Sequence, residues 1–229
     1  MKKIITYFFV LFISLINAQS LTGIFVLRRT AAVGDSKELS KNFQIPDFYL
    51  YSYSNNKSLL EKISKGGTKI DTLKKTLEEY NFNYETIATD IEPTKVLYYK
   101  DLQNKLYENV RVADNKKFFI KDNLPVINWA ITKETKTIEG YLCTKATTDR
   151  MVVGYPLKIS AWFCEKLPIS DGPFDYSGLP GFILEFSYDG LSTTTFTNLK
   201  YNAKQKIEIS PLTSSVKPMT MREYEKSYK

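Results

Sequence analysis

Hydrophobic and polar residues alternate with a period of two along most of the chain, which predicts a protein built mainly from β-strands. In Pro46–Tyr53, for example, one face of the predicted strand carries Tyr49, Tyr51 and Tyr53. Short connections separate the strands, and parallel neighbours would need long crossovers, so we expect antiparallel pairing. We therefore predict a single, mainly β domain with a curved antiparallel sheet or half-barrel. The other predicted strands are Gly23–Arg29, Val96–Lys100, Lys105–Val112, Lys117–Lys121, Ile127–Glu134, Thr137–Thr147, Leu157–Lys166, Phe182–Tyr188, Thr193–Lys200 and Lys206–Ser210, with a hairpin turn at Asp189-Gly190.

Two parts of the chain show helical spacing instead. Four apolar residues from Ile70 to Tyr80 recur every three to four positions, which predicts an amphipathic helix over Asp71–Tyr80. A shorter helical piece is predicted at Leu59–Ser64, so that residues 55–93 read as a helical insertion, either a lid or a mobile loop. Near the end of the chain, Thr220 is a predicted N-cap for a last helix over Met221–Tyr228, within residues 220–229.

The first twenty residues have the composition of a secretory signal peptide. Lys2 and Lys3 form a basic start, Ile4–Ile16 is apolar, and Ala18 offers a small residue for cleavage. We predict a signal peptide over residues 1–18, a domain over residues 19–229, and export by a Sec-type route to the periplasm or cell envelope. An uncleaved anchor is the alternative, but the apolar run is shorter than the ~20 residues of a spanning helix. We expect no transmembrane segment in the mature chain.

The composition excludes several kinds of active site. The 229 residues include no histidine, which removes Ser-His and Cys-His catalytic sets and histidine-bound metals. The two cysteines do not suffice for a structural zinc site, and we expect neither a metal nor a cofactor. The formal net charge is +7, without a long basic run, so we expect no nucleic-acid partner.

Cys143 and Cys164 fall on consecutive predicted strands. If these strands form a hairpin that turns at Val153-Gly154, residues whose numbers add to 307 face each other, which places the two sulfurs opposite each other. An oxidising compartment then favours a disulfide. A slip of one residue would put them on opposite faces. A disulfide, two inert buried thiols and a redox-active pair therefore stay open as alternatives.

The segment from Leu167 to Phe186 carries the most conformational information. Between Pro168 and Phe182 it holds three glycines and three prolines, which encode a tightly specified loop between two strands. Such a loop either closes one end of the sheet or presents backbone N–H groups to a ligand. Its candidate binding residues are Asp171, Gly172, Pro173, Tyr176, Gly178, Leu179, Pro180, Gly181 and Phe182.

The same segment resembles the signature of a known family. Asp171-Gly172-Pro173 and Tyr176–Glu185 (YSGLPGFILE) closely resemble the signature of the GLPGLI family, with Phe182 in place of a leucine. The blocks that extend the resemblance over about residues 122–200 are Trp129–Ile131, Lys136–Tyr141, Cys143–Ala146, Ala161–Phe163 and Leu167–Ile169. The family comprises exported proteins of Bacteroidetes, generally described as of unknown function. The resemblance implies export and a β-rich fold, and it supplies no catalytic residues.

These features predict a non-catalytic protein that binds a ligand or partner at the cell envelope. In one hypothesis, a curved sheet rich in aromatic residues shelters a lipid or an acyl chain. In another, strand edges or the glycine- and proline-rich loop contact an outer-membrane protein. The alternative is a periplasmic hydrolase that uses carboxylates near the loop, from among Asp171, Asp175 and Glu185. Asp171 and Asp175 are also the residues that a calcium site would use.

Overall fold

The computed structural model describes residues 19–29, 46–63, 96–113, 116–152, 155–202 and 206–227. The predicted signal peptide over residues 1–18, the predicted helix Asp71–Tyr80 and most of the predicted insertion 55–93 lie outside these residues. Within the described ranges, no helix is both long and apolar enough to cross a membrane.

Eleven strands in the described residues form one antiparallel sheet, in the order β6-β5-β4-β3-β2-β1-β11-β10-β9-β8-β7. The sheet does not close into a barrel, and the prediction of a mainly β, single-sheet domain is confirmed. The strands are β1 (Ser20–Arg29), β2 (Asp47–Ser54), β3 (Lys57–Lys62), β4 (Leu97–Asp101), β5 (Leu106–Ala113), β6 (Lys116–Asn123), β7 (Ala130–Ile138), β8 (Tyr141–Val152), β9 (Tyr155–Cys164), β10 (Phe182–Tyr188) and β11 (Ser192–Asn202).

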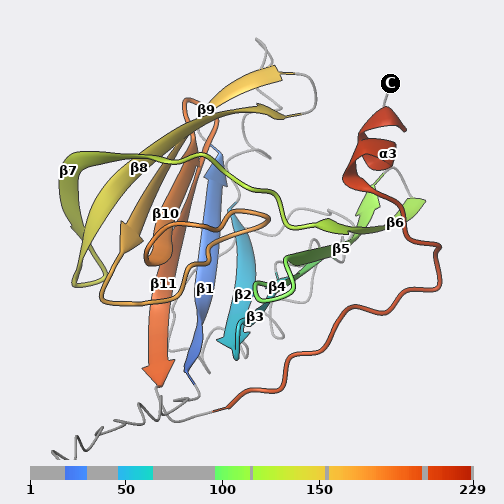
Figure 1. The fold of residues 1–229 in the computed structure, drawn as a ribbon, viewed down its shortest axis with the longest axis horizontal. Helices are drawn as coiled ribbons and strands as arrows, with labels where there is room; N and C mark the ends of the chain where they lie inside the picture. Colours follow the sequence, from blue (N-terminus) through green and yellow to red (C-terminus); the bar gives the residue numbers. More distant parts are fainter. Residues whose placement is uncertain are drawn as a thin grey trace, which may run out of the picture.

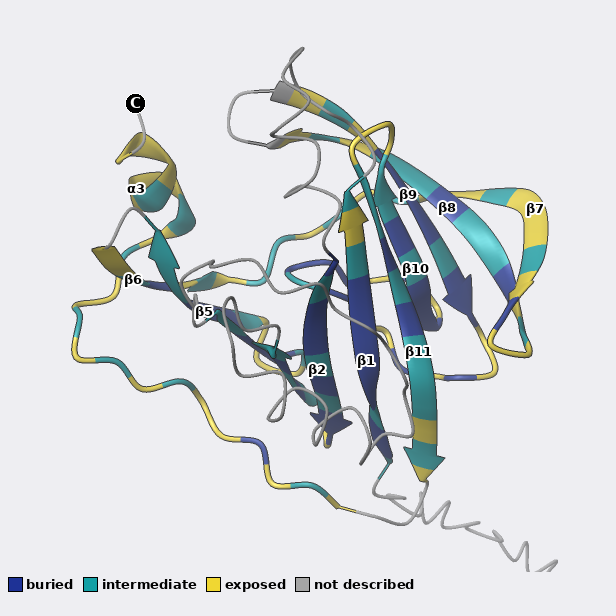
Figure 2. Cartoon of the chain, turned by 180° about the vertical axis from the view of Figure 1, so that it is seen from behind, coloured by how far each residue is buried: buried dark blue, intermediate teal, exposed yellow. Residues whose placement is uncertain are grey.

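The sheet consists of two meanders, β1 to β6 and β7 to β11, which meet where β1 pairs with β11. Figure 1 shows that the sheet bends, with β7–β9 and β4–β6 on two sides of a concave face. The loop between β9 and β10, residues 165–181, lies over this face. Figure 2, from behind, shows that β1, β2 and β10 consist mostly of buried residues.

Aromatic side chains fill the space between the centre of the sheet and the loop. The Phe25 ring centre lies 4.6 Å from that of Phe196 and 5.6 Å from that of Tyr51, and Phe182 packs 4.9 Å from Phe196. Gly23 is needed here, because a Cβ at this position would lie 2.3 Å from the Phe196 ring. All four of these aromatic side chains are 0% exposed, so this cluster is the centre of the core.

Three sequence-based predictions are wrong. The predicted helical piece Leu59–Ser64 is replaced by β3, which pairs with β2 on one side and β4 on the other. The predicted strand Thr137–Thr147 is divided by a tight turn at Glu139-Gly140, whose φ angles are +49° and +78°. Positive φ at both central positions is the geometry of a two-residue hairpin turn.

The predicted strand Lys206–Ser210 is also absent. Both edges of β11 are already paired, one with β1 and the other with β10. This part of the tail therefore cannot add to β11 as a further strand. Instead the tail runs across to β6 (Figure 1). Two side chains of the sheet bind the backbone of the tail. Ser54 accepts a hydrogen bond from the Ile207 N–H at 3.1 Å, and Glu108 accepts one from the Leu212 N–H at 2.7 Å.

The last helix begins where the sequence predicts. Helix α3 (Met221–Lys226) follows Thr220, which forms a capping box with Glu223. Just before it, Met219 pairs with the outer strand β6 through a parallel bridge to Ile120. The tail thus covers part of the β6 edge and carries α3 to the rim of the concave face.

Candidate binding site

A buried ion pair anchors the β9–β10 loop to the sheet. Asp171 is 0% exposed, and its carboxylate pairs with the ammonium of Lys100 on β4, which is 1% exposed. Lys100 Nζ also donates to the backbone oxygens of Gly172 at 2.6 Å and Tyr176 at 3.3 Å. The Tyr51 hydroxyl donates to Asp171 Oδ2 at 2.7 Å. These partners meet the requirement that a buried charge be both paired and hydrogen-bonded.

The predicted binding residues of this loop are mostly buried. Among the nine, only Gly178 and Pro180 are exposed, while Leu179 and Phe182 are 1% and 0% exposed. A Cβ at Gly181 would lie 2.3 Å from the backbone oxygen of Cys164. The loop therefore packs as part of the core, and of its predicted binding residues Tyr176 lines a cavity on the concave face.

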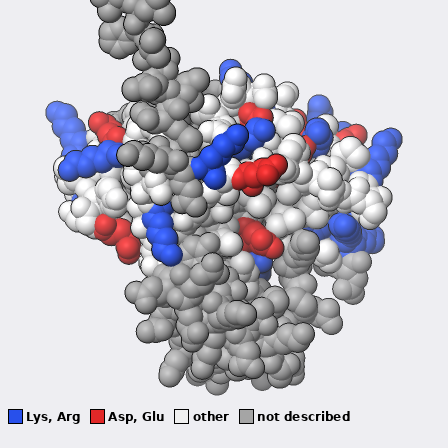
Figure 3. All heavy atoms as spheres, turned by 90° about the horizontal axis from the view of Figure 1, so that it is seen from below, with Lys and Arg blue, Asp and Glu red and all other residues white. Residues whose placement is uncertain are grey.

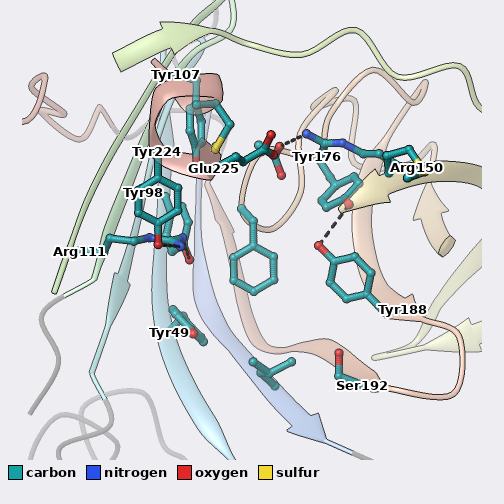
Figure 4. Close-up of a pocket in the computed structure, with 15 residues that line it drawn as sticks. Tyr49, Tyr98, Tyr107, Arg111, Arg150, Tyr176, Tyr188, Ser192, Tyr224 and Glu225 are labelled. Carbon is teal, nitrogen blue, oxygen red and sulfur yellow. Dashed lines mark hydrogen bonds and ion pairs between the residues drawn. The ribbon is translucent and has the colours of Figure 1, made fainter. Parts of the chain in front are cut away.

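A cavity of about 320 Å³ opens between the tip of this loop, both sides of the concave face and α3. Its volume is at the small end of the range for small-molecule sites. Figure 4 shows its side chains converging from the two meanders. Six of the lining residues are tyrosines; the full set is Leu27, Tyr49, Tyr98, Tyr107, Arg111, Arg150, Met151, Phe174, Asp175, Tyr176, Tyr188, Ser192, Met221, Tyr224 and Glu225.

One wall of the cavity holds a compensated charge. Arg150 on β8 pairs with Asp175 at the loop tip, with 2.7 Å between Nη2 and Oδ2. The Arg150 guanidinium carbon lies 5.3 Å from the centre of the Tyr176 ring. The Tyr176 and Tyr188 hydroxyls are hydrogen-bonded at 3.1 Å, as the dashed lines in Figure 4 show. This wall is therefore tied together by its own polar groups.

The opposite wall carries Arg111 from β5. Its Nη1 and Nη2 atoms donate to the hydroxyls of Tyr224 at 3.2 Å and Tyr98 at 3.1 Å. Its Nε donates to Asn109 Oδ1 at 2.7 Å. The guanidinium carbon is 5.2 Å from the Tyr224 ring centre and 5.8 Å from that of Tyr98. All three acceptors are uncharged side chains, unlike the carboxylate that Arg150 contacts.

The tyrosines between these walls supply hydrogen-bond donors. Burial raises the pKa of the Tyr49, Tyr98 and Tyr107 phenols above the usual value. These groups therefore keep their protons at neutral pH.

The carboxylates proposed for a hydrolase do not assemble at this cavity. Asp171, Asp175 and Glu185 each pair with a different basic side chain, and the three basic residues come from different strands. Only Asp175 lines the cavity. Across the ranges that the structure describes, no group of three or more acidic or cysteine side chains is placed to hold a metal ion.

The cysteines lie where the predicted register puts them. Thr144 on β8 faces Phe163 on β9, so facing residue numbers add to 307 as predicted. Cys143 and Cys164 are buried, and the structure holds them as free thiols rather than as a disulfide. Burial, followed by the neighbouring Cys164, raises the pKa of the Cys143 thiol to about 12. This is the environment of an inert thiol.

Sequence reasoning missed Arg111 and Arg150 because no local motif joins them. They lie on β5 and β8, which belong to different meanders and are far apart in the strand order. A partial signal exists in β5, where Tyr107, Asn109 and Arg111 share one face. The sequence alone does not show that this polar face turns toward the concave side.

A second cavity, of about 310 Å³, lies beside the exposed part of the β9–β10 loop. Val126 on its rim is 86% exposed. Gly178 is the one predicted binding residue among those that line it, which are Leu102, Lys105, Leu124, Pro125, Val126, Ile127, Ser170, Ser177 and Gly178.

Charged side chains of both signs are interspersed over the described part of the face in Figure 3. Local pairs form among such residues elsewhere on the sheet: Asp47 contacts Arg29 at 2.5 Å and Lys62 at 2.8 Å. Burial raises the pKa of the Asp47 carboxyl, but the two basic neighbours outweigh this effect and hold the pKa below its usual value.

Comparison with known proteins supports the fold but gives no activity. A family model described as "Protein of unknown function (Porph_ging)" matches residues 150–185, from the end of β8 through the loop into β10. The match covers the GLPG-containing loop, while the GLPGLI assignment itself stays a prediction. No curated protein matches the chain.

Two solved structures of PNGF-II, in the C2 and P21 space groups, are similar to this chain. Their TM-scores are 0.51 and 0.53, with 16% and 17% sequence identity. The alignments cover 91% of this chain but 32% and 33% of the PNGF-II chains, so this chain spans about a third of their length. At this identity the likeness shows a shared fold only.

Proposed function

We propose that this is an exported, non-catalytic binding protein that holds a small, largely apolar ligand in the tyrosine-lined cavity. The observation that carries the proposal is the cavity itself, where apolar and aromatic side chains from both meanders converge with a few polar groups. That combination is typical of small-molecule sites. Its small volume favours one ring system or one short chain over an entire two-chain lipid.

Native mass spectrometry tests this proposal on mature protein purified gently from the envelope of its host. We expect a small molecule to be retained in the native spectrum and lost on denaturation. Ser192→Trp places a large ring at the cavity wall and should abolish retention. Ser210→Trp, at an exposed site outside the cavity, should not. Melting curves establish that both variants fold.

Two results would contradict the proposal. Retention of the same molecule by folded Ser192→Trp would place the ligand elsewhere. The absence of any retained molecule, together with no binding of either naphthalene-2-carboxylate or naphthalene-2-carboxamide at millimolar concentration, would contradict the binding function.

A second candidate function is contact with an outer-membrane partner at the second cavity. The strongly exposed Val126 and the exposed Gly178 support this location. Val126→Asp should reduce cross-linking of the protein to an envelope protein, while Val112→Asp at the end of β5 is a control away from this cavity. Unchanged cross-linking in the first variant would argue against this site.

A further inference from the structure

Arg111 carries a charge that is not paired with any carboxylate among the described residues. In the ranges that the structure describes, the ion pairs within 4.0 Å do not include Arg111. Three of its N–H groups donate to neutral oxygens. A guanidinium has five such donors, so two are left for a further acceptor. Arginine cannot lose its charge at ordinary pH, so the positive charge at the cavity persists.

The groups beside Arg111 are also donors. The Tyr98 oxygen accepts from Arg111, which leaves its own proton available. The hydroxyls of Tyr49 and Tyr107 line the cavity and form no hydrogen bond within the described part of the chain. Three phenolic O–H groups and two guanidinium N–H groups therefore surround one region of the cavity.

The acidic charge nearest this region is already compensated: besides burial, Asp175 raises the pKa of the Tyr98 and Tyr107 phenols, but a basic side chain pairs with its carboxylate. Asp175 is paired with Arg150 at 2.7 Å, and Glu225 is an exposed residue of α3 at the rim. The apolar part of the lining includes Phe174, Met151 and Leu27. The cavity thus combines a positive, donor-rich end with an apolar body.

We propose that the cavity selects a small organic anion, with a carboxylate bound by Arg111 and the neighbouring tyrosine hydroxyls and with a flat or short aliphatic body packed against Phe174. Hydrogen bonds from a guanidinium to a carboxylate are stronger than those between neutral groups, and they are frequently bidentate. This inference rests on the proposed binding function and specifies the chemical class of its ligand.

Calorimetry with two probes of the same shape tests the inference on the folded full chain without its signal peptide. Naphthalene-2-carboxylate and naphthalene-2-carboxamide share their ring system and differ in charge. We expect the wild-type protein to bind the carboxylate about tenfold more tightly or better, because charged hydrogen bonds contribute more than neutral ones. Equal binding of the two probes would overturn the anion inference while leaving the proposed binding function intact. Binding of neither probe would overturn both.

Three variants locate the preference. Arg111→Gln should bind both probes equally, and Arg111→Lys should retain part of the preference for the carboxylate. Arg28→Gln is the matched control, because Arg28 is exposed and does not line the cavity. A preference that survives in folded Arg111→Gln would overturn the assignment to Arg111.

Discussion

Replacing Lys100 by methionine tests whether the buried ion pair holds the β9–β10 loop in place. Methionine keeps most of the length of the side chain but removes the ammonium. The change leaves the Asp171 carboxylate, which is 0% exposed, without its cation. It also removes the donor to the backbone oxygens of Gly172 and Tyr176. The hydrogen bond from Tyr51 is the only one of these contacts that can persist.

The expected loss in the free energy of unfolding is large. Removing one partner of a buried ion pair typically costs about 3–5 kcal/mol, because the other charge is left buried and uncompensated. For a protein of this size, each kcal/mol lowers Tm by about 2–4 °C, so a fall of roughly 6–20 °C is expected.

Urea denaturation and thermal melting measure this loss. The matched control is Lys145→Met, because Lys145 pairs at 3.0 Å with Glu134, whose side chain is 59% exposed. Exposed pairs contribute only about 0–1 kcal/mol. A loss for Lys100→Met no larger than that of the control would refute the view that this ion pair anchors the loop.

Three further predictions concern glycine packing, thiol reactivity and pH dependence. Gly181→Ala should lower Tm more than Gly190→Ala, because a Cβ at Gly181 meets backbone atoms of Cys164, whereas a Cβ at Gly190 meets nothing within 4 Å and carries only the strain of a φ of +75°; equal melting temperatures would contradict the close approach. The folded protein should not react with a thiol reagent at pH 8, since burial raises the pKa of Cys143 to about 12, and the unfolded, unreduced protein should release two thiols; none released would mean a disulfide. The lowered pKa of Asp47 means that its ion pairs stabilise the fold above the usual carboxyl pKa, and that this stabilisation is lost as the pH falls through the lowered value. Asp47→Asn should therefore reduce Tm at pH 7 more than at pH 2, and an equal reduction at both pH values would count against this linkage.

Local chemistry in the sequence determined much of the fold. Period-two alternation identified most of the strands, and Asp189-Gly190 identified the turn between β10 and β11, where Gly190 has a φ of +75°. Thr220 marked the start of α3. The register of β8 and β9 followed from the predicted position of their turn, because facing residues of a hairpin lie at equal distances along the chain from the turn. These features depend on residues close together in the chain, so one sequence is enough to predict them.

Only the tertiary structure decided the rest. The sequence around Leu60 predicts a helix, but in the structure this segment is a strand because β2 and β4 pair with it on both sides. Arg111 and Arg150 meet at one cavity because the two meanders curve toward each other and the loop tip enters between them. The sequence predicted the loop as rigid, but only its packing against Lys100 shows that it belongs to the core and that the cavity forms beside it. The physical reason is that strand pairing, sheet curvature and burial depend on contacts between residues far apart in the chain, which local periodicity does not encode.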